Sequence, residues 1–338
     1  SRNYTNFTKT KRPKGVAYVG ITVWETDSIP NPVARILSEL DCVIVPSSHS
    51  RRSFQESGVD TRIEVVPHTF DPDVWKKPRP EDVTIDTDRK YIFYFIGTPI
   101  ERKNMKTLLR AYFTAFEGND DVLLRLKSSG EQAALVQLAK KALEESGIDP
   151  AKRPAMRLYT EHWDTEKMRA FHLDGDCFVS ATRGEGFGLS EFEAKLCGSR
   201  VITTGWGSVS EFLKPRKPVQ PGVTKGPYRS PGEMLEPPQV DILVPAELTS
   251  VDGMFGVGCY DPKQRWADPS LEALIESMRL AAQQRLSPDL AAWDRLYGIY
   301  RPEVVGSQLA DALMKARKEA KEEDDDDFWT QETDSTPD

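Results

Sequence analysis

The sequence predicts an α/β protein built from two doubly wound domains with parallel sheets. Short apolar segments typical of buried strands alternate with amphipathic helical segments, which favours parallel sheets flanked by helices. The chain has 338 residues, of which 38% are hydrophobic, and this size is enough for two medium cores. A proline-rich, charged stretch at 71–88 interrupts the alternation. We interpret that stretch as an interdomain linker.

The part before the linker predicts a β-α-β-α-β order, which is half of a doubly wound domain. Apolar runs indicate strands at 15–24, 42–46 and 63–67. Helical spacing of apolar residues indicates helices at 32–40 and 50–57. We therefore expect residues 1–80 to form a partial N-terminal domain.

The part after the linker predicts a larger α/β unit over residues 81–285. Strands are expected at 91–96, 122–126, 156–159, 177–180 and 201–203, and helices at 106–116, 132–145, 166–171 and from about Ser190. A long loop rich in Pro, Gly and Lys follows at 214–238, and loops of that length are usually functional or mobile. Amphipathic patterns predict helices at 271–284 and 304–318. We expect helices within 286–317 to pack back on the N-terminal domain.

The net charge of −8 is concentrated at the C-terminal end. Residues 318–338 contain two Lys and ten acidic residues, which account for the whole net charge, so the remainder of the chain is neutral. This acidic segment is predicted to be a disordered tail, with an interaction peptide anchored by Phe328 and Trp329 as the alternative. At the other end, Arg2, Lys9, Lys11, Arg12 and Lys14 form a basic arm, for which a solvated end is favoured over a phosphate or lipid contact.

Several function classes are disfavoured by composition. The four Cys are isolated from one another, so neither a disulfide framework nor a zinc site is indicated. The four His lack paired spacing, and the Asp-x-Asp triplets at 71, 86 and 174 read as turns rather than metal ligands. No apolar run approaches the ~20 residues of a membrane span, and no signal peptide is recognisable. We expect a soluble, cytoplasmic protein without a bound metal.

The most informative stretch is Glu185-Gly-Phe-Gly-Leu-Ser-Glu-Phe-Glu193, which follows the apolar run 177–182. It places two carboxylates eight positions apart around a Gly-x-Gly turn, between a strand and a helix. In open α/β sheets, ligands bind beyond the carboxyl ends of strands. The unpaired N–H groups at the start of a helix attract anions and hydroxyls. Taken alone, the pattern is also compatible with an ordinary turn and two solvated acids.

This stretch resembles the E-x7-E motif of retaining nucleotide-sugar glycosyltransferases with the GT-B fold, glycosyltransferase family 4 (glycosyl transferases group 1). The resemblance extends over about residues 15–285. It implies two Rossmann-like domains, with the nucleotide-sugar donor bound by the C-terminal one. It also implies a metal-independent enzyme that has no cofactor and uses a UDP- or GDP-linked sugar as substrate. The acceptor would be a hydroxyl compound, such as a glycan.

The segment Gly97-Thr-Pro-Ile-Glu-Arg-Lys-Asn104 follows the strand at 91–96 and would supply positive charge for the leaving diphosphate. Lys103 stands where the resemblance implies the phosphate-binding lysine. Thr98 stands where the family often has Arg, and Arg102 is the candidate replacement. The alternative is that both cations are ordinary surface charges before a helix.

The resemblance also implies roles for the residues of the turn. Glu185 would bind hydroxyls of the donor sugar, and the backbone N–H groups of Phe187, Gly188 and Leu189 would lie beside the sugar and phosphate. Glu193 would accept hydrogen bonds from the ribose. The side chains of Phe187 and Leu189 are expected to be core. The base pocket would lie near Lys127, together with the residues at 128–129 and 161–163.

The N-terminal domain departs from the family pattern, because about a hundred family residues that normally precede residue 15 are absent. We expect either a fragment, a domain completed by a protein partner, or a minimal enzyme. One alternative function is a non-catalytic module that binds a sugar nucleotide or a partner. Another is transfer to hydroxymethylated bases of DNA, supported by Lys and Arg of the 214–229 loop and opposed by the neutral folded part.

Overall fold

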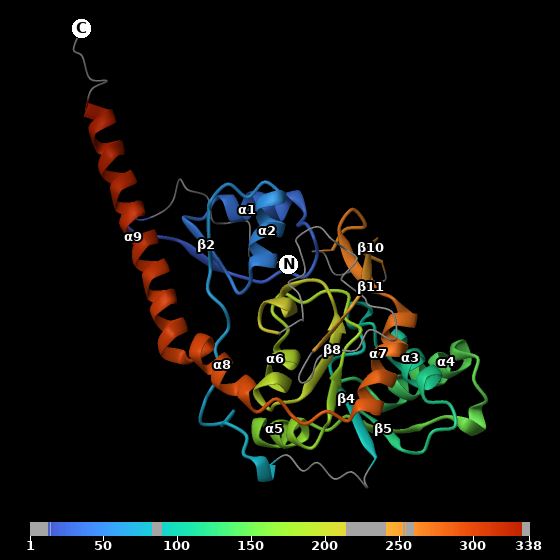
Figure 1. The fold of residues 1–338 in the computed structure, drawn as a ribbon. Coiled ribbons are helices and arrows are strands. Elements are labelled where there is room, and N and C mark those ends of the chain that lie inside the picture. Colours follow the sequence, from blue (N-terminus) through green and yellow to red (C-terminus); the bar gives the residue numbers. More distant parts are fainter. Residues whose placement is uncertain are drawn as a thin grey trace.

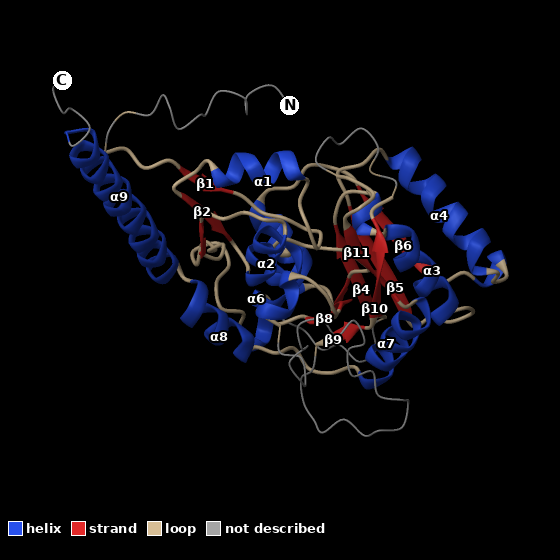
Figure 2. Cartoon of the chain, turned by 90° about the horizontal axis from the view of Figure 1, so that it is seen from above, coloured by secondary structure: helices blue, strands red, loops and turns tan. Residues whose placement is uncertain are grey.

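The computed structural model places the chain in two parallel sheets with helices around them (Figures 1 and 2). It describes residues 13, 15–82, 90–213, 241–252, 254 and 260–332, and only the backbone of 321–332. The predicted α/β class with parallel sheets is confirmed. Several features that the sequence analysis describes lie outside the described residues: the basic arm up to Lys14, most of the second half of the linker, and the long loop predicted at 214–238.

The N-terminal sheet has three parallel strands in the order β1-β2-β3. Its elements are β1 (Val19–Ile21), α1 (Asn31–Ser38), β2 (Cys42–Val45), α2 (Ser48–Glu56) and β3 (Arg62–Val65). The β-α-β-α-β order is as predicted, and β1 is shorter than the apolar run at 15–24 suggests. Ser47 caps α2 by accepting a hydrogen bond from the backbone N–H of Ser50 at 3.2 Å.

The central strand β2 is buried on both faces, and its side chains alternate between two layers. Val43 and Val45 pack with Phe54 of α2 and Leu37 of α1. Cys42 and Ile44 pack on the other face with Ala312 and Ala316 of α9 (Pro302–Glu332). The helix α9 thus covers the face of the sheet opposite α1 and α2 (Figure 2). A parallel strand covered on both sides reads as a continuous apolar run, as 42–45 does.

The C-terminal sheet has six parallel strands in the order β6-β5-β4-β7-β8-β9. They are β4 (Tyr91–Ile96), β5 (Val122–Lys127), β6 (Ala155–Tyr159), β7 (Cys177–Val179), β8 (Arg200–Thr204) and β9 (Ile242–Val244). The helices are α3 (Met105–Ala115), α4 (Gln132–Ser146), α5 (Thr165–Leu173), α6 (Leu189–Leu196) and α7 (Leu271–Gln284). Short 3-10 helices lie at η2 (Pro80–Asp82), η3 (Glu101–Lys103), η4 (Pro150–Lys152) and η5 (Ser208–Glu211).

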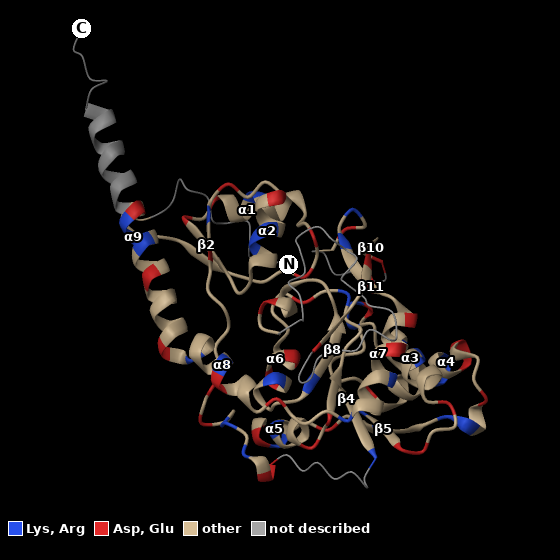
Figure 3. Ribbon diagram, viewed as in Figure 1, with Lys and Arg blue, Asp and Glu red and all other residues tan. Residues whose placement is uncertain are grey.

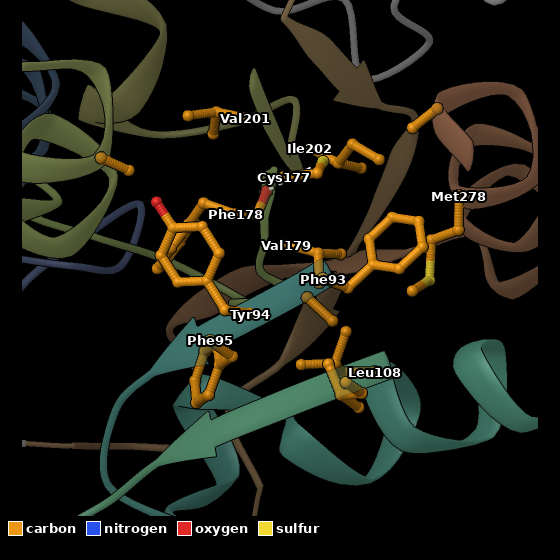
Figure 4. Packing of buried hydrophobic residues seen from close by; sticks show 14 of the residues in the cluster. Phe93, Tyr94, Phe95, Leu108, Cys177, Phe178, Val179, Val201, Ile202 and Met278 are labelled. Carbon is orange, nitrogen blue, oxygen red and sulfur yellow. Dashed lines mark hydrogen bonds between the residues drawn. The ribbon is translucent and has the colours of Figure 1, made fainter. Parts of the chain in front are cut away.

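The core of this domain is built on β4, whose side chains alternate across the sheet. Phe93 packs with Tyr112 and Phe116 on the α3 side, and Figure 4 shows it beside Met278 of α7. Tyr94 packs edge-on against Phe171 of α5, on the other side of the sheet. Both faces of the strand are therefore buried, and charged residues lie mainly on the surrounding helices and loops (Figure 3).

The helix α8 (Ala291–Tyr300) lies within 286–317, where helices are expected. Three strands were not predicted from the sequence: β9 and the antiparallel pair β10 (Ala246–Ser250) and β11 (Arg265–Pro269). The antiparallel pair carries charged and hydroxyl side chains, and only its Ala246, Trp266, Ala267 and Pro269 are buried. Because so few residues of this pair of strands are apolar and buried, the alternation of apolar and polar residues that indicates a strand is weak in the sequence.

The helix α9 is longer than predicted and differs from the expected disordered tail. The structure keeps the backbone helical from Pro302 through Glu332, so residues 318–332 continue the helix. Residues 333–338 lie outside the described residues. Lys, Ala and Glu dominate the start of this segment and are strong helix formers. An ion pair between Arg62 of β3 and Glu319, at 2.6 Å, ties that part of the helix to the N-terminal sheet.

The two sheets meet through the segment after β1 and the Gly-rich turn after β7. A Cβ placed on Gly186 would overlap the Val23 side chain and lie 3.0 Å from the carbonyl oxygen of Trp24. We expect Gly186→Ala to destabilise the protein by about 1–3 kcal/mol through this overlap, measured by urea unfolding. Gly298→Ala on α8 is the control, because nothing lies within 4 Å of its Cβ position. Equal midpoints for the two variants would contradict the close approach.

No helix among the described residues has both the length and the apolar composition needed to cross a membrane. The described cysteines, Cys42, Cys177 and Cys197, are buried free thiols.

Candidate functional site

The candidate site lies beyond the carboxyl ends of β4 and β7, which are neighbours in the six-stranded sheet. The chain runs outward from β4 to β5 and β6 on one side, and from β7 to β8 and β9 on the other. The connections at such a reversal leave the sheet on opposite faces, which opens a place for ligands between the two loops. The loop after β4 carries Arg102 and Lys103, and the loop after β7 carries Glu185.

These three side chains form one ionic cluster. Lys103 Nζ lies 2.7 Å from Glu185 Oε1, and Arg102 Nη1 lies 3.0 Å from Glu185 Oε2. The hydroxyl of Thr182 donates to Glu185 Oε1 at 2.7 Å. Glu185 is buried, with 6% of its surface exposed. The structure therefore brings together the three residues that the sequence assigns to catalysis, and they are not ordinary surface charges.

The charges in the cluster stabilise one another. Burial alone would raise the pKa of Glu185, but the positive charges of Lys103 and Arg102 outweigh it and lower the pKa below its ordinary value. Burial also opposes the charge of Arg102, and the carboxylates of Glu185 and Glu25 raise its pKa nevertheless. The ion pairs therefore favour the charged forms of Glu185 and Arg102.

A second network holds the two loops against each other. Asp268 of β11 accepts hydrogen bonds from Arg183 Nε at 2.8 Å and from Asn104 Nδ2 at 3.3 Å. Arg183 Nη1 also donates to the carbonyl oxygen of Glu101 at 3.0 Å. Asn104 has a φ of 47°, in the left-handed region that Asn tolerates better than most residues. Sequence reasoning missed Asp268, because it is far from both motifs in the chain.

The helix α6 begins directly after the Gly-rich turn. Gly188 at its N-cap has φ 89° and ψ 58°, and no side chain caps the helix from that position. The N-cap residue therefore supplies no acceptor for the first N–H groups of α6, and a helix N-terminus of this kind favours an anion. Phe187 is buried as expected, but Leu189 is 51% exposed, so its prediction as a core residue is wrong. Leu189 is the first residue of α6, where the helix emerges from the core.

Glu193 is not part of the ionic cluster. It lies on the second turn of α6 and is partly exposed, and its Oε2 is 3.6 Å from Nε2 of the buried His172 on α5. The structure therefore leaves the carboxylate accessible at the side of α6, and its role in ribose binding stays a prediction.

The residues expected near the base lie together beyond β5. Lys127 is buried, donates to the carbonyl oxygen of Ser128 at 3.2 Å, and has its ammonium 5.1 Å from the centre of the Trp163 ring. Burial lowers the pKa of Lys127. In the neighbouring loop, the hydroxyl of Thr98 is 3.2 Å from that of Ser129. Gly97 has no room for a side chain, because a Cβ would lie 2.7 Å from Phe95.

The N-terminal domain contributes side chains that sequence reasoning did not assign. Glu25 Oε1 is 3.6 Å from Arg102 Nη2, and Glu25 Oε2 accepts a hydrogen bond from Tyr260 at 3.0 Å. Asp27 pairs with Arg265 of β11 at 2.7 Å. These contacts connect the segment after β1 with the candidate site. They join residues that are far apart in the sequence, so only the three-dimensional structure reveals them.

The Asp-x-Asp at 174–176 serves the fold. Asp174 pairs with Arg125 of β5, and Asp176 accepts a hydrogen bond from the backbone N–H of Ile92 at 2.7 Å. Within the described ranges, no group of three or more His, Cys, Asp or Glu side chains is arranged to hold a metal ion.

Comparison with known proteins gives similarity in structure only. No protein-family model matches the sequence, and no curated protein matches it either. Sucrose-phosphate synthase from Thermosynechococcus elongatus is 16% identical, with a TM-score of 0.58 over 84% of this chain and 60% of its own. The α,α-trehalose 6-phosphate synthase of Burkholderia multivorans is 8% identical, with a TM-score of 0.59 over 89% and 67%.

A third similar structure is TarM of S. aureus, determined in complex with UDP, which is 12% identical with a TM-score of 0.56 over 87% of this chain and 50% of its own. These similarities show that the chain has the GT-B type of fold. The chain spans about half to two thirds of the length of these proteins.

Proposed function

We propose that the protein is a retaining glycosyltransferase that moves a sugar from a nucleoside diphosphate to an acceptor hydroxyl. The observation that carries the proposal is the buried cluster of Lys103, Arg102 and Glu185 near the N-terminus of α6, which has no side-chain N-cap. Similar structures include glycosyltransferases determined in complex with UDP. The donor would bind to the C-terminal domain, and the acceptor would enter from the side of the N-terminal domain.

The cluster suits the chemistry of a leaving diphosphate. Negative charge develops on the diphosphate as the bond to the sugar breaks, and preorganised positive groups stabilise that charge. Lys103 and Arg102 would supply these groups together with the N–H groups of α6, without the need for a metal ion. The released diphosphate, held next to the sugar, would take the proton of the acceptor hydroxyl.

Glu185 would have two tasks in this scheme. It holds both cations in place, and its remaining lone pairs would accept hydrogen bonds from hydroxyls of the donor sugar. A carboxylate that accepts from Lys103, Arg102 and Thr182 is fixed in one orientation. A fixed acceptor positions a polyhydroxylated ligand with little loss of entropy on binding.

A second candidate is a non-catalytic module that binds a sugar nucleotide. It is favoured by the N-terminal sheet, which has three strands within the described residues, and by the short span relative to the similar structures. Incubation with UDP- and GDP-linked sugars separates the two functions, because release of UDP or GDP requires turnover. We expect release, and we expect it to persist in the presence of a chelator.

We expect Lys103→Ala and Glu193→Ala each to weaken donor binding about tenfold or more, because each removes a polar contact to the donor that is worth at least ~1.4 kcal/mol. Calorimetric titration with the nucleotide sugar that turns over measures the effect. Lys106→Ala, an exposed lysine one position into α3 that pairs with Glu145, is the control. Donor affinity equal to the wild type in both site variants would remove the assignment.

A further inference from the structure

A buried carboxyl group lies directly behind the turn that the proposed function assigns to the donor. Glu191 is the third residue of α6 and only 1% of its surface is exposed. Its Oε2 atom has no hydrogen-bond partner. The same atom would lie 3.3 Å from a Cβ placed on Gly188, so the carboxyl group stands beside the N-cap of the helix. An unpartnered buried oxygen at this position calls for an explanation.

The surroundings of Glu191 combine apolar packing with opposed charges. Val209 and Phe212 contact the same Gly188 position from η5 and the residue after it. Glu185 from the loop after β7 and Lys103 from η3 act on the carboxyl group through their charges, and Ser180 after β7 acts through its hydroxyl. Burial and then the charge of Glu185 raise the pKa of Glu191 to about 7, while Lys103, the backbone N–H of Glu191 itself and the hydroxyl of Ser180 counteract the shift. The group therefore changes its charge near neutral pH.

We propose that Glu191 controls the affinity for the donor diphosphate by its state of protonation. The neutral acid leaves the N-terminus of α6 and the cations Lys103 and Arg102 available to the diphosphate. The carboxylate places a negative charge at the same helix N-terminus and competes with the ligand for these positive groups. This inference rests on the proposed function and assigns a role in its binding site to a residue that the sequence analysis left without one.

The direction of the effect follows from the charge. Below pH 7 Glu191 is mostly protonated, and the donor binds without the negative charge of this carboxylate at the start of α6. As the pH rises through about 7, the carboxylate forms and donor affinity falls. A bound diphosphate would in turn hold Glu191 protonated to higher pH, so donor binding above pH 7 takes up a proton. For a donor that binds well only to the neutral acid, the dissociation constant rises by about tenfold for each pH unit above the midpoint.

The experiment is a titration of donor binding against pH in the full chain. The ligand is UDP-glucose or whichever UDP- or GDP-linked sugar turns over, because its diphosphate has no group that titrates near neutral pH, unlike the terminal phosphate of UDP with a pKa near ~6. Dissociation constants are measured by calorimetry between pH 6 and 8.5 for the wild type, for Glu191→Gln and for Glu144→Gln. Glu144 is an exposed glutamate of α4 and serves as the control.

We expect the wild type and Glu144→Gln to lose about tenfold in affinity or more between pH 6 and 8.5, and Glu191→Gln to lose less than about twofold. Ser180→Ala provides a second variant that keeps the acid. Removal of the hydroxyl that stabilises the carboxylate should move the midpoint of the profile to higher pH. In the wild type, binding above pH 7 should take up protons, measured as a buffer-dependent heat.

A profile of Glu191→Gln that matches the wild type, or a Ser180→Ala midpoint that does not move upward, would overturn the role of Glu191. In those outcomes the donor still binds and the proposed function stands. Absence of donor binding by the wild type at every pH would instead remove the proposed function and this inference together.

Discussion

Replacement of Lys195 by Met is expected to destabilise the folded protein by about 3–5 kcal/mol. Lys195 of α6 is buried between two carboxylates, with its Nζ 3.1 Å from Asp241 and 3.5 Å from Asp289. The methionine fills the volume of the stem but leaves both acids in the protein interior without this cation. Arg295 still pairs with Asp289 at 3.3 Å, so the uncompensated charge is mainly that of Asp241.

Urea unfolding measures the loss in free energy of unfolding, and two further variants test whether the unpaired buried charge causes it. Lys77→Met removes an ion pair to Asp294 in which both side chains are about half exposed, and it should cost less than about 1 kcal/mol. Addition of Asp241→Asn to Lys195→Met should recover part of the loss, since the amide oxygen can still accept from the backbone N–H of Val201. A midpoint for Lys195→Met close to that of Lys77→Met would contradict the buried pair.

The strand and helix order of the C-terminal sheet could be predicted because its residues carry periodic patterns. The strand predicted at 91–96 and the helix predicted at 271–284 match β4 and α7 residue for residue. Both have strong signals: a continuous apolar run for a strand covered on two faces, and apolar residues at helical spacing for a helix on the sheet. The proximity of Lys103 and Glu185 was also predictable, since both follow parallel strands whose carboxyl ends meet at one edge.

The parts that could not be predicted depend on contacts between distant segments. The strand β11 contacts the candidate site through Asp268, which pairs with Arg183, and contacts the N-terminal domain through Arg265, which pairs with Asp27. Neither Asp268 nor Arg265 is part of a sequence motif or of a periodic apolar pattern. In the sequence, nothing distinguishes Glu191 from the other acidic residues of the predicted helices. Its burial depends on how α6 packs against η5, which residue spacing does not specify. The exposed Leu189 shows the same limit, because its apolar side chain predicts a core position, whereas the first residue of a helix can lie at the surface.

Glu185→Gln is expected to lower the rate of donor turnover by about 10²–10³. The amide has the shape of the acid but no charge, so Lys103 and Arg102 lose the anion that fixes them at 2.7 and 3.0 Å. Two like charges then remain close together in a buried site and move apart, and the positive groups are no longer preorganised for the leaving diphosphate. The same loss should destabilise the fold, because Arg102 is largely buried and keeps only the more distant Glu25 as an ionic partner, beside its hydrogen bond to the carbonyl oxygen of Gly184.

The rate is measured as release of UDP or GDP from the nucleotide sugar in water, so that no acceptor need be known. Glu101→Gln is the matched control: it lies in the same loop as Lys103, and its carboxylate is 58% exposed and pairs with Arg183. Because Lys103 and Arg102 lower the pKa of Glu185, the cluster stabilises the wild type above the pKa of the unfolded chain, about 4.3. That stabilisation is lost as the pH falls toward the lower pKa of the folded state. Glu185→Gln should therefore lose this part of the acid sensitivity. Equal rates of UDP or GDP release by Glu185→Gln and Glu101→Gln would show that the charge of Glu185 does not contribute to donor turnover.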